Sequence, residues 1–247
     1  MRAEVTRMAL SEDRFWEDDR RDARAQVQDR ILLLSLCSRL DRCGSIGDQM
    51  KVQKSVFLAE YTAAGTGTLV FSHPYFRWKY GPFSKELKDD YSLLSDPQFR
   101  YLEGGDQFDL SPKGSALADA FWFDVLRMEE NESIRKLLAT VADHCGSKNG
   151  WVLQKEVYKL RVRSAPSRDS AADKEIEETV ENTPQTYEFR VLPKEPRHIL
   201  VIPEEWEETL AMELQARSVA RESLKRAQAD IAAGRVREGL GLPEDAE

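Results

Sequence analysis

Apolar residues recur with a helical period over most of this chain and with a strand period at a few short places. A spacing of three and four residues predicts a helix with one buried face. The expected helices cover residues 31–40, 51–61, 84–94, 134–141, 151–160 and 203–214, and another restarts near Ser115. A later stripe of Leu224, Ala227 and Ile231 predicts one more helix, which Gly234 would end.

Two short segments alternate in a way that predicts strands. Residues 76–80 read FRWKY, so aromatic side chains would face one way and the basic ones, Arg77 and Lys79, the other. Gly81 and Pro82 then interrupt the pattern, and a proline suits the first turn of a helix. We therefore expect a strand that passes into the next helix through a Gly-Pro corner. Residues 99–110 contain a Gly-Gly turn between two aromatic runs and predict a hairpin.

Three helices followed by a hairpin are the ingredients of a winged helix, a relative of the helix-turn-helix. The expected fold is mainly α with small β-hairpins, in the α+β class, with a winged-helix-like helical core and a C-terminal hairpin and helical extension. Few large apolar residues lie at 164–186, which predicts a linker. The expected parts are a charged N-terminal arm (1–29), the core (30–163), the linker (164–186) and a hairpin with an acidic helical segment (187–247).

The negative charge of the chain is confined to its last third. Residues 1–164 hold 25 Lys and Arg against 25 Asp and Glu, whereas residues 165–247 hold 11 against 19, which accounts for the whole net charge of −8. An acidic segment of this kind repels nucleic acid and suits a basic protein partner.

Cysteine usage and hydropathy indicate a cytoplasmic protein. Cys37, Cys43 and Cys145 form no CxxC pair, which argues for a reducing compartment and against a disulfide framework or a zinc site. The longest apolar run, at 31–34, is far too short to span a membrane, and the first 30 residues contain no signal-peptide core. We expect no membrane association.

The sequence contains no recognisable catalytic or cofactor motif. His73, His144 and His198 are scattered, and no nucleophile–base pair, P-loop, HExxH or GxGxxG pattern is present. We expect a protein that is not an enzyme and that needs no cofactor or metal.

Three segments resemble the Panacea, or SocA-like, antitoxin family: KVQKSVFLAEY (51–61), FRWKYGPFSKEL (76–87) and YLEGGDQFDLSPKG (101–114). The positions that match the motifs of this family are Lys51, Lys54, Tyr80, Gly81, Pro82, Leu110, Ser111 and Gly114. The resemblance implies a winged-helix-like core that binds and neutralises a cognate toxin. The same motifs occur in uncharacterised phage-associated winged-helix proteins, so the resemblance leaves the role open.

The C-terminal segments VIPEEWEETL (201–210) and ESLKRAQADIAAGRV (222–236) are similar to the tails of Phd/YefM-type antitoxins. In that family an acidic amphipathic tail wraps the toxin. The upstream part of this chain departs from the family, because the family's DNA-binding domain is not visible in it. The resemblance implies that Trp206, Leu210 and Leu214 are partner-binding residues. The alternative is that this stripe packs on the core of its own chain, as most amphipathic helices do.

The preferred interpretation is an antitoxin-like protein that neutralises a cognate toxin by direct protein–protein contact. The alternative is a winged-helix DNA-binding transcriptional regulator or phage-associated protein. The helix after the corner carries Lys85 and Lys88 but also three acidic residues, which predicts weak binding to phosphates. A third interpretation makes the corner a packing feature only, and self-association is left open. The candidate motif and partner-binding residues are Lys51, Lys54, Arg77, Lys79, Tyr80, Gly81, Pro82, Phe83, Lys85, Trp206, Leu210 and Leu214.

Overall fold

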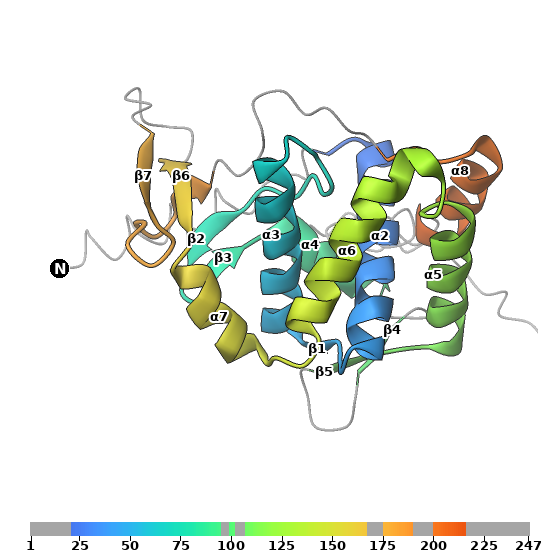
Figure 1. Ribbon diagram of the computed structural model, residues 1–247, viewed down its shortest axis with the longest axis horizontal. Coiled ribbons are helices and arrows are strands. Elements are labelled where there is room, and N and C mark those ends of the chain that lie inside the picture. Colours follow the sequence, from blue (N-terminus) through green and yellow to red (C-terminus); the bar gives the residue numbers. More distant parts are fainter. Residues whose placement is uncertain (1–20, 95–98, 102–106, 167–174, 190–199, 216–247) are drawn as a thin grey trace, which may run out of the picture.

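Helices and two small antiparallel sheets make up the computed structural model, which describes residues 21–94, 99–101, 107–166, 175–189 and 200–215 (Figure 1). The central helices α2 (Ala23–Arg42) and α3 (Gln49–Gly65) both contact α6 (Glu132–Cys145). On either side of this group, α5 (Pro112–Asp124) packs on α2 and α7 (Gly150–Tyr158) packs on α3. The mainly helical α+β prediction is confirmed. Among the described residues, no helix combines the length and the apolar character that crossing a bilayer requires.

Helix α2 is the centre of the core. Every residue from Ile31 to Ser38 is buried, which is typical of a helix surrounded by other elements. The helix begins at Ala23, eight residues earlier than the apolar run suggests, because the side chain of Asp22 caps it by accepting a hydrogen bond from the Ala25 amide at 2.7 Å. The expected N-terminal arm at 1–29 therefore ends in ordered helix, and its residues 1–20 lie outside the described part.

The expected hairpin after the third helix is present. Helix α4 (Lys85–Leu94) is followed by β4 (Phe99–Tyr101) and β5 (Gln107–Leu110), which pair antiparallel. Strand β5 also pairs with β1 (Gly47–Asp48), a two-residue strand between α2 and α3, so the sheet order is β1-β5-β4.

The second sheet has the order β3-β2-β8-β6-β7 and corrects the expected linker. Strand β6 (Arg161–Ala165) enters the expected linker at 164–186, β7 (Ile176–Thr179) lies within it, and both pair antiparallel. A linker was predicted because the edge strand β7 reads IEET and has little apolar character. The buried side chains nearest to β7 in the sequence, those of Val180 and Thr183, lie just after the strand.

The expected C-terminal hairpin at 187–202 is also different in the structure. Strand β8 (Glu188–Phe189) pairs with β2 (Phe76–Trp78) and β6, so it joins the sheet that contains the corner. Residues 200–202 form no strand, and 190–199 lie outside the described residues. The segment at 200–202 is held by the 3-10 turn η1 (Glu129–Asn131). Asn131 exchanges two hydrogen bonds with the backbone of Val201.

The apolar stripe at the C-terminus packs on the core of this chain. Helix α8 (Glu204–Leu210) continues into a π-helical turn, η2 (Ala211–Gln215), and Leu210 and Leu214 are buried. Trp206 packs edge-on against Phe121 of α5 with ring centroids 5.7 Å apart, and Arg30 of α2 donates to the Leu214 carbonyl at 3.2 Å. These side chains therefore serve the fold, which is the second of the two alternatives for this stripe. The expected later helix at 224–231 lies outside the described residues.

We expect Leu210→Ala to lower the free energy of unfolding by about 2–5 kcal/mol, because it empties a fully buried site. The measurement is urea unfolding followed by circular dichroism. The matched control is Met212→Ala in the adjoining π-helical turn, where the side chain is 69% exposed and the change should be small. Equal effects of the two substitutions would show that α8 is not docked as described.

Candidate functional site

The FRWKYGPF segment forms a tight hairpin instead of a strand that enters the helix directly. Strands β2 (Phe76–Trp78) and β3 (Gly81–Phe83) pair antiparallel, and the turn between them consists of Lys79 and Tyr80. Pro82 lies in β3 at the edge of the sheet, which is where a proline without an amide proton is tolerated. Helix α4 begins only after Ser84, whose hydroxyl accepts a hydrogen bond from the Leu87 amide at 3.2 Å.

The two lysines of the K-x-x-K motif are buried and bind backbone carbonyls. Lys51 Nζ donates to the carbonyl oxygens of Ser45 and Gly146, both at 2.7 Å. Lys54 Nζ donates to the Pro82 carbonyl at 2.7 Å, and burial lowers the pKa of Lys54 to about 7. Both side chains hold α3 in register with its neighbours and are not accessible to a partner.

Arg77 also lies inside the molecule, which corrects the expected alternation of the strand. Its Nε donates to the Val180 carbonyl at 2.9 Å, it donates to the Trp78 carbonyl, and its guanidinium lies 5.0 Å from the ring of Tyr158. A buried arginine is acceptable at this position because carbonyl groups and an aromatic face replace water. On the neighbouring strand Phe83 packs edge-on against Phe76, with ring centroids 5.5 Å apart.

The tip of the hairpin stays exposed and meets α7. Tyr80 is 41% exposed and Trp151 53% exposed, and their rings lie 5.6 Å apart at 80°. Val152 beside them is also exposed, and the inner face of α7 is formed by Leu153 and Val157. Lys79 Nζ lies 5.2 Å from the Tyr80 ring.

We call this surface the corner patch, defined by Lys79, Tyr80, Trp151, Val152, Lys155 and Lys159. Lys155 and Lys159 follow Trp151 at intervals of four residues, so the three side chains share one side of α7 and its C-terminal end. Sequence reasoning identified Lys79 and Tyr80 and missed the α7 residues. A signal was available in the sequence. Trp151 and Val152 are two large apolar residues in a short helix whose buried face is already formed by other residues.

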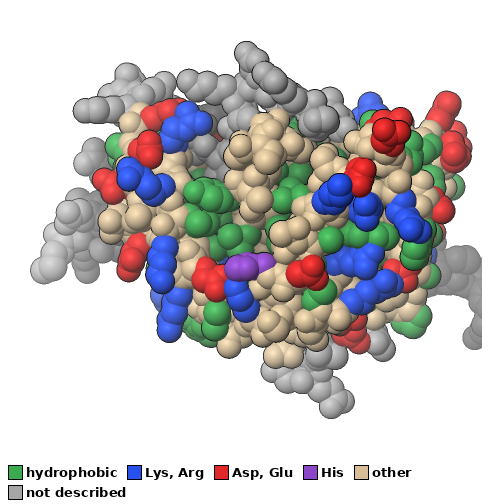
Figure 2. All heavy atoms as spheres, viewed as in Figure 1, with side chains coloured by type: hydrophobic (Ala, Val, Ile, Leu, Met, Phe, Trp, Pro, Cys, Tyr) green, Lys and Arg blue, Asp and Glu red, His purple; other side chains and the backbone are tan. Residues whose placement is uncertain are grey.

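Helix α4 offers little cationic surface. Lys85 pairs with Asp89 at 3.5 Å, Asp90 is buried, and Lys88 is exposed. On the separate face drawn in Figure 2, acidic and basic side chains are likewise interspersed. Neither observation points to a one-sign surface of the kind that tracks phosphates.

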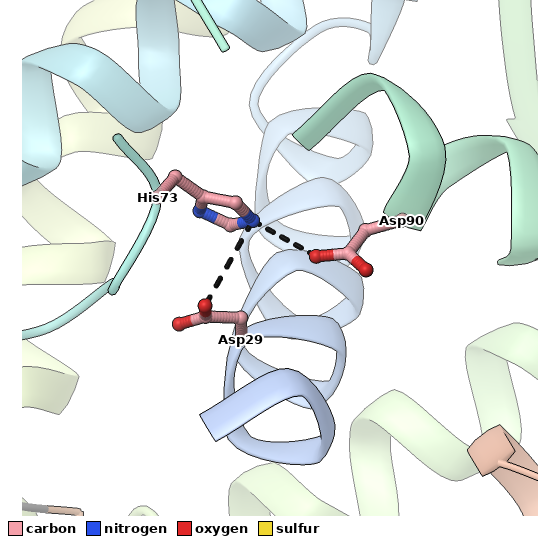
Figure 3. A group of neighbouring side chains, drawn as sticks. All are labelled: Asp29, His73 and Asp90. Atoms are coloured by element: carbon pink, nitrogen blue, oxygen red, sulfur yellow. Dashed lines mark hydrogen bonds and ion pairs between the residues drawn. The ribbon is translucent and has the colours of Figure 1, made fainter. Parts of the chain in front are cut away.

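A second group of polar side chains is buried between α2, α4 and the segment before β2 (Figure 3). His73 Nε2 lies 2.9 Å from Asp90 Oδ2 and 3.9 Å from Asp29 Oδ2. All three side chains are almost fully buried, and one ligand-type atom of each lies within 4.8 Å of the others. Sequence reasoning missed the group because its members come from separate segments.

Arg21 occupies the position that a metal ion would need in this group. Its Nη1 lies 2.7 Å from Asp29 Oδ2 and 2.6 Å from Asp90 Oδ2. The other two carboxylate oxygens accept hydrogen bonds from the Ser72 amide at 2.9 Å and from Arg30 Nε at 2.8 Å. The cation between the carboxylates is therefore a guanidinium, and we assign no metal ligand here.

Burial has opposite outcomes for the two aspartates. Burial raises the pKa of Asp29 above its usual range, and the charges of its neighbours do not fully offset this. Burial acts in the same direction on Asp90, but the hydrogen bond from His73 and the charge of Arg21 outweigh it and hold the pKa of Asp90 below its usual range.

A groove of about 340 Å³ lies between the C-terminal end of α3 and the β6–β7 hairpin. Tyr61, Arg161 and Glu177 are among the residues that line it. Arg161 Nε lies 3.3 Å from Glu177 Oε1, so charges of both signs already face each other there. The groove presents no convergent polar groups that would define a ligand.

Comparisons of the chain with protein-family models, with curated proteins and with solved structures gave no match.

We expect Gly81→Ala to lower the free energy of unfolding by about 1–3 kcal/mol. Gly81 has φ +94°, and an added Cβ would lie 2.8 Å from Cε1 of Tyr158. The measurement is thermal or urea unfolding. Gly67→Ala, at φ +71° with nothing within 4 Å, isolates the backbone contribution, and Gly65→Ala, at the end of α3 with no neighbour within 4 Å, is the control that should not destabilise. A Gly81 variant as stable as the Gly65 variant would contradict the prediction.

Proposed function

We propose that this chain is an antitoxin-like protein that binds and neutralises a toxin protein through the corner patch. The observation that carries the proposal is the exposed Tyr80–Trp151 pair, in which Tyr80 belongs to a motif resembling the Panacea family. Tyrosine and tryptophan dominate many protein–protein contacts, because they bury large areas with few rotatable bonds.

The charge around the pair defines the kind of partner. Lys79, Lys155 and Lys159 make no ion pair with the described residues, whereas the arginines of β6 both face glutamates. Free cations around an apolar centre match a partner surface that is acidic at its rim. The net charge of −8 disfavours long-range attraction of nucleic acid.

The proposal moves the contact surface away from the C-terminal helix. Trp206, Leu210 and Leu214 were candidates for partner binding by resemblance to antitoxin tails, but these side chains pack on α2 and α5. Releasing them to bind a toxin would expose core surface, which makes α8 a poor contact element. A contribution from residues 216–247 is tested by deleting them.

We expect Tyr80→Ala and Trp151→Ala each to weaken binding to the toxin by about 30-fold or more, since truncation of a central aromatic anchor typically costs at least ~2 kcal/mol. The product of the adjacent reading frame is the candidate toxin, and the measurements are growth rescue on co-expression and calorimetric Kd. The control is Phe123→Ala on α5, which is equally exposed at 53% but lies outside the corner patch.

Folded Tyr80 and Trp151 variants that still rescue growth would contradict the proposed surface. If a chain ending at residue 215 loses rescue while the Trp151 variant keeps it, the neutralising element lies in the tail.

A winged-helix DNA-binding regulator is the second candidate, and one specific observation favours it. The order α2–β1–α3–α4–β4–β5, with β1 paired to β5, resembles that of a winged helix, in which α4 would take the place of the recognition helix. The insertion of β2 and β3 between α3 and α4 departs from the simple form. The ion pair between Lys85 and Asp89 leaves few cations for phosphates.

We expect no binding to the promoter of its own operon in the range of about 10⁻⁸–10⁻¹¹ M that specific complexes reach at physiological salt. Fluorescence anisotropy with a labelled promoter duplex measures this. Nanomolar binding that is lost in the double variant Lys85→Ala, Lys88→Ala would instead support the regulator.

A further inference from the structure

The buried group around His73 has a side that lacks hydrogen bonds. His73 Nδ1 lies 3.9 Å from Glu60 Oε1, and neither atom makes a close hydrogen bond. The second Glu60 oxygen and the hydroxyl of Tyr75 are also without a hydrogen-bond partner. Glu60 is 3% exposed and His73 and Tyr75 are each 1% exposed. Unsatisfied polar groups at this depth are costly, so their protonation states decide how costly the site is.

The charges that face this pair come from every element around it. Helix α2 and the residue before its cap supply Asp29, Arg30 and Arg21; α3 supplies Glu60; α4 supplies Asp90; and the segment before β2 supplies His73 and Tyr75. Two guanidinium groups balance the two aspartates. A neutral His73 beside an ionised Glu60 would therefore leave one unpaired negative charge in an apolar core.

One additional proton removes that imbalance. On Glu60 it makes a neutral acid beside a neutral imidazole, and on His73 Nδ1 it makes an imidazolium between the carboxylates of Glu60 and Asp90. Both arrangements bring the group to zero net charge. Asp90 fixes the ring so that Nε2 donates to it and Nδ1 faces Glu60.

We propose that the His73–Glu60 pair holds one proton, on one residue or the other, in the folded protein at neutral pH, so that this buried group makes folding sensitive to pH. The role is independent of the toxin partner. It is a property of the core, because the group connects α2, α3 and α4 to the segment that leads into the hairpin.

The direction of the pH dependence follows from linkage. Burial and the neighbouring Asp29 charge raise the pKa of Glu60 well above its ordinary value of 4.5, against smaller opposing effects of Arg21 and the His73 backbone amide. Well above the ordinary histidine pKa of about 6.5, an unfolded chain holds this proton on neither side chain, whereas the folded chain keeps it. Folding therefore takes up a proton there, and stability falls as the pH rises.

The test compares the full-length wild type with Glu60→Gln in urea unfolding between pH 6.5 and 9.5. The ratio of the wild-type folding constant to that of Glu60→Gln should fall by about tenfold per pH unit until the folded chain loses the proton. Lys54, whose pKa burial lowers to about 7, is common to both chains and cancels. The exposed Glu130→Gln variant is the control and should keep a constant ratio. A constant ratio for Glu60→Gln would overturn the proposal.

A second measurement does not depend on the variant folding. Carbon-13 and nitrogen-15 NMR of the wild type at pH 8 should find either a carboxylic acid at Glu60 or an imidazolium at His73. A neutral imidazole beside an ionised Glu60 carboxylate would overturn the proposal.

Discussion

The carboxylate of Asp90 joins three buried side chains from separate segments, and the packing of α4 depends on it. It accepts hydrogen bonds from His73, Arg21 and Arg30, all of them buried. The charges of Asp90, Arg21 and Arg30 are costly to take out of water, and only their mutual geometry offsets the cost. Because these donors surround the one carboxylate of Asp90, they fix where α4 lies relative to α2 and to the segment before β2.

Helix α3 fixes the other side of the same region. The side-chain amide of Gln53 donates to the Ser84 carbonyl at 2.8 Å and accepts from the Ser84 amide at 2.9 Å, and Lys54 binds the Pro82 carbonyl. These contacts hold β3 and the residue that joins it to α4. The hairpin tip is thus presented by a backbone that is already ordered, which lowers the entropy lost when a partner binds.

The sequence predicted the elements with strong local periodicity and failed where an outcome depends on distant residues. The stripes of α2, α3 and α6 were visible because apolar spacing is a property of one segment. The burial of Arg77 could not be predicted in this way, because its contacts, the Val180 carbonyl and the Tyr158 ring, lie far along the chain. Glu60 and Asp90 resemble ordinary solvated positions of their helices until His73 and Arg21 are placed beside them. The strand β7 was missed because an edge strand with polar side chains has the composition of a linker.

The same comparison separates two roles within the motif that resembles the Panacea family. Lys51 and Lys54, spaced three residues apart, face the same side of α3 and bind backbone carbonyls of other segments. Such residues define a scaffold, since any partner would have to unfold it to reach them. Recognition of a particular partner must then come from side chains that the scaffold leaves exposed. At this end of the molecule those are Tyr80 and Trp151, one from the hairpin turn and one from α7. A buried motif can therefore be shared among proteins with different partners. Under the proposed function, the two exposed rings and the lysines around them would determine which partner fits.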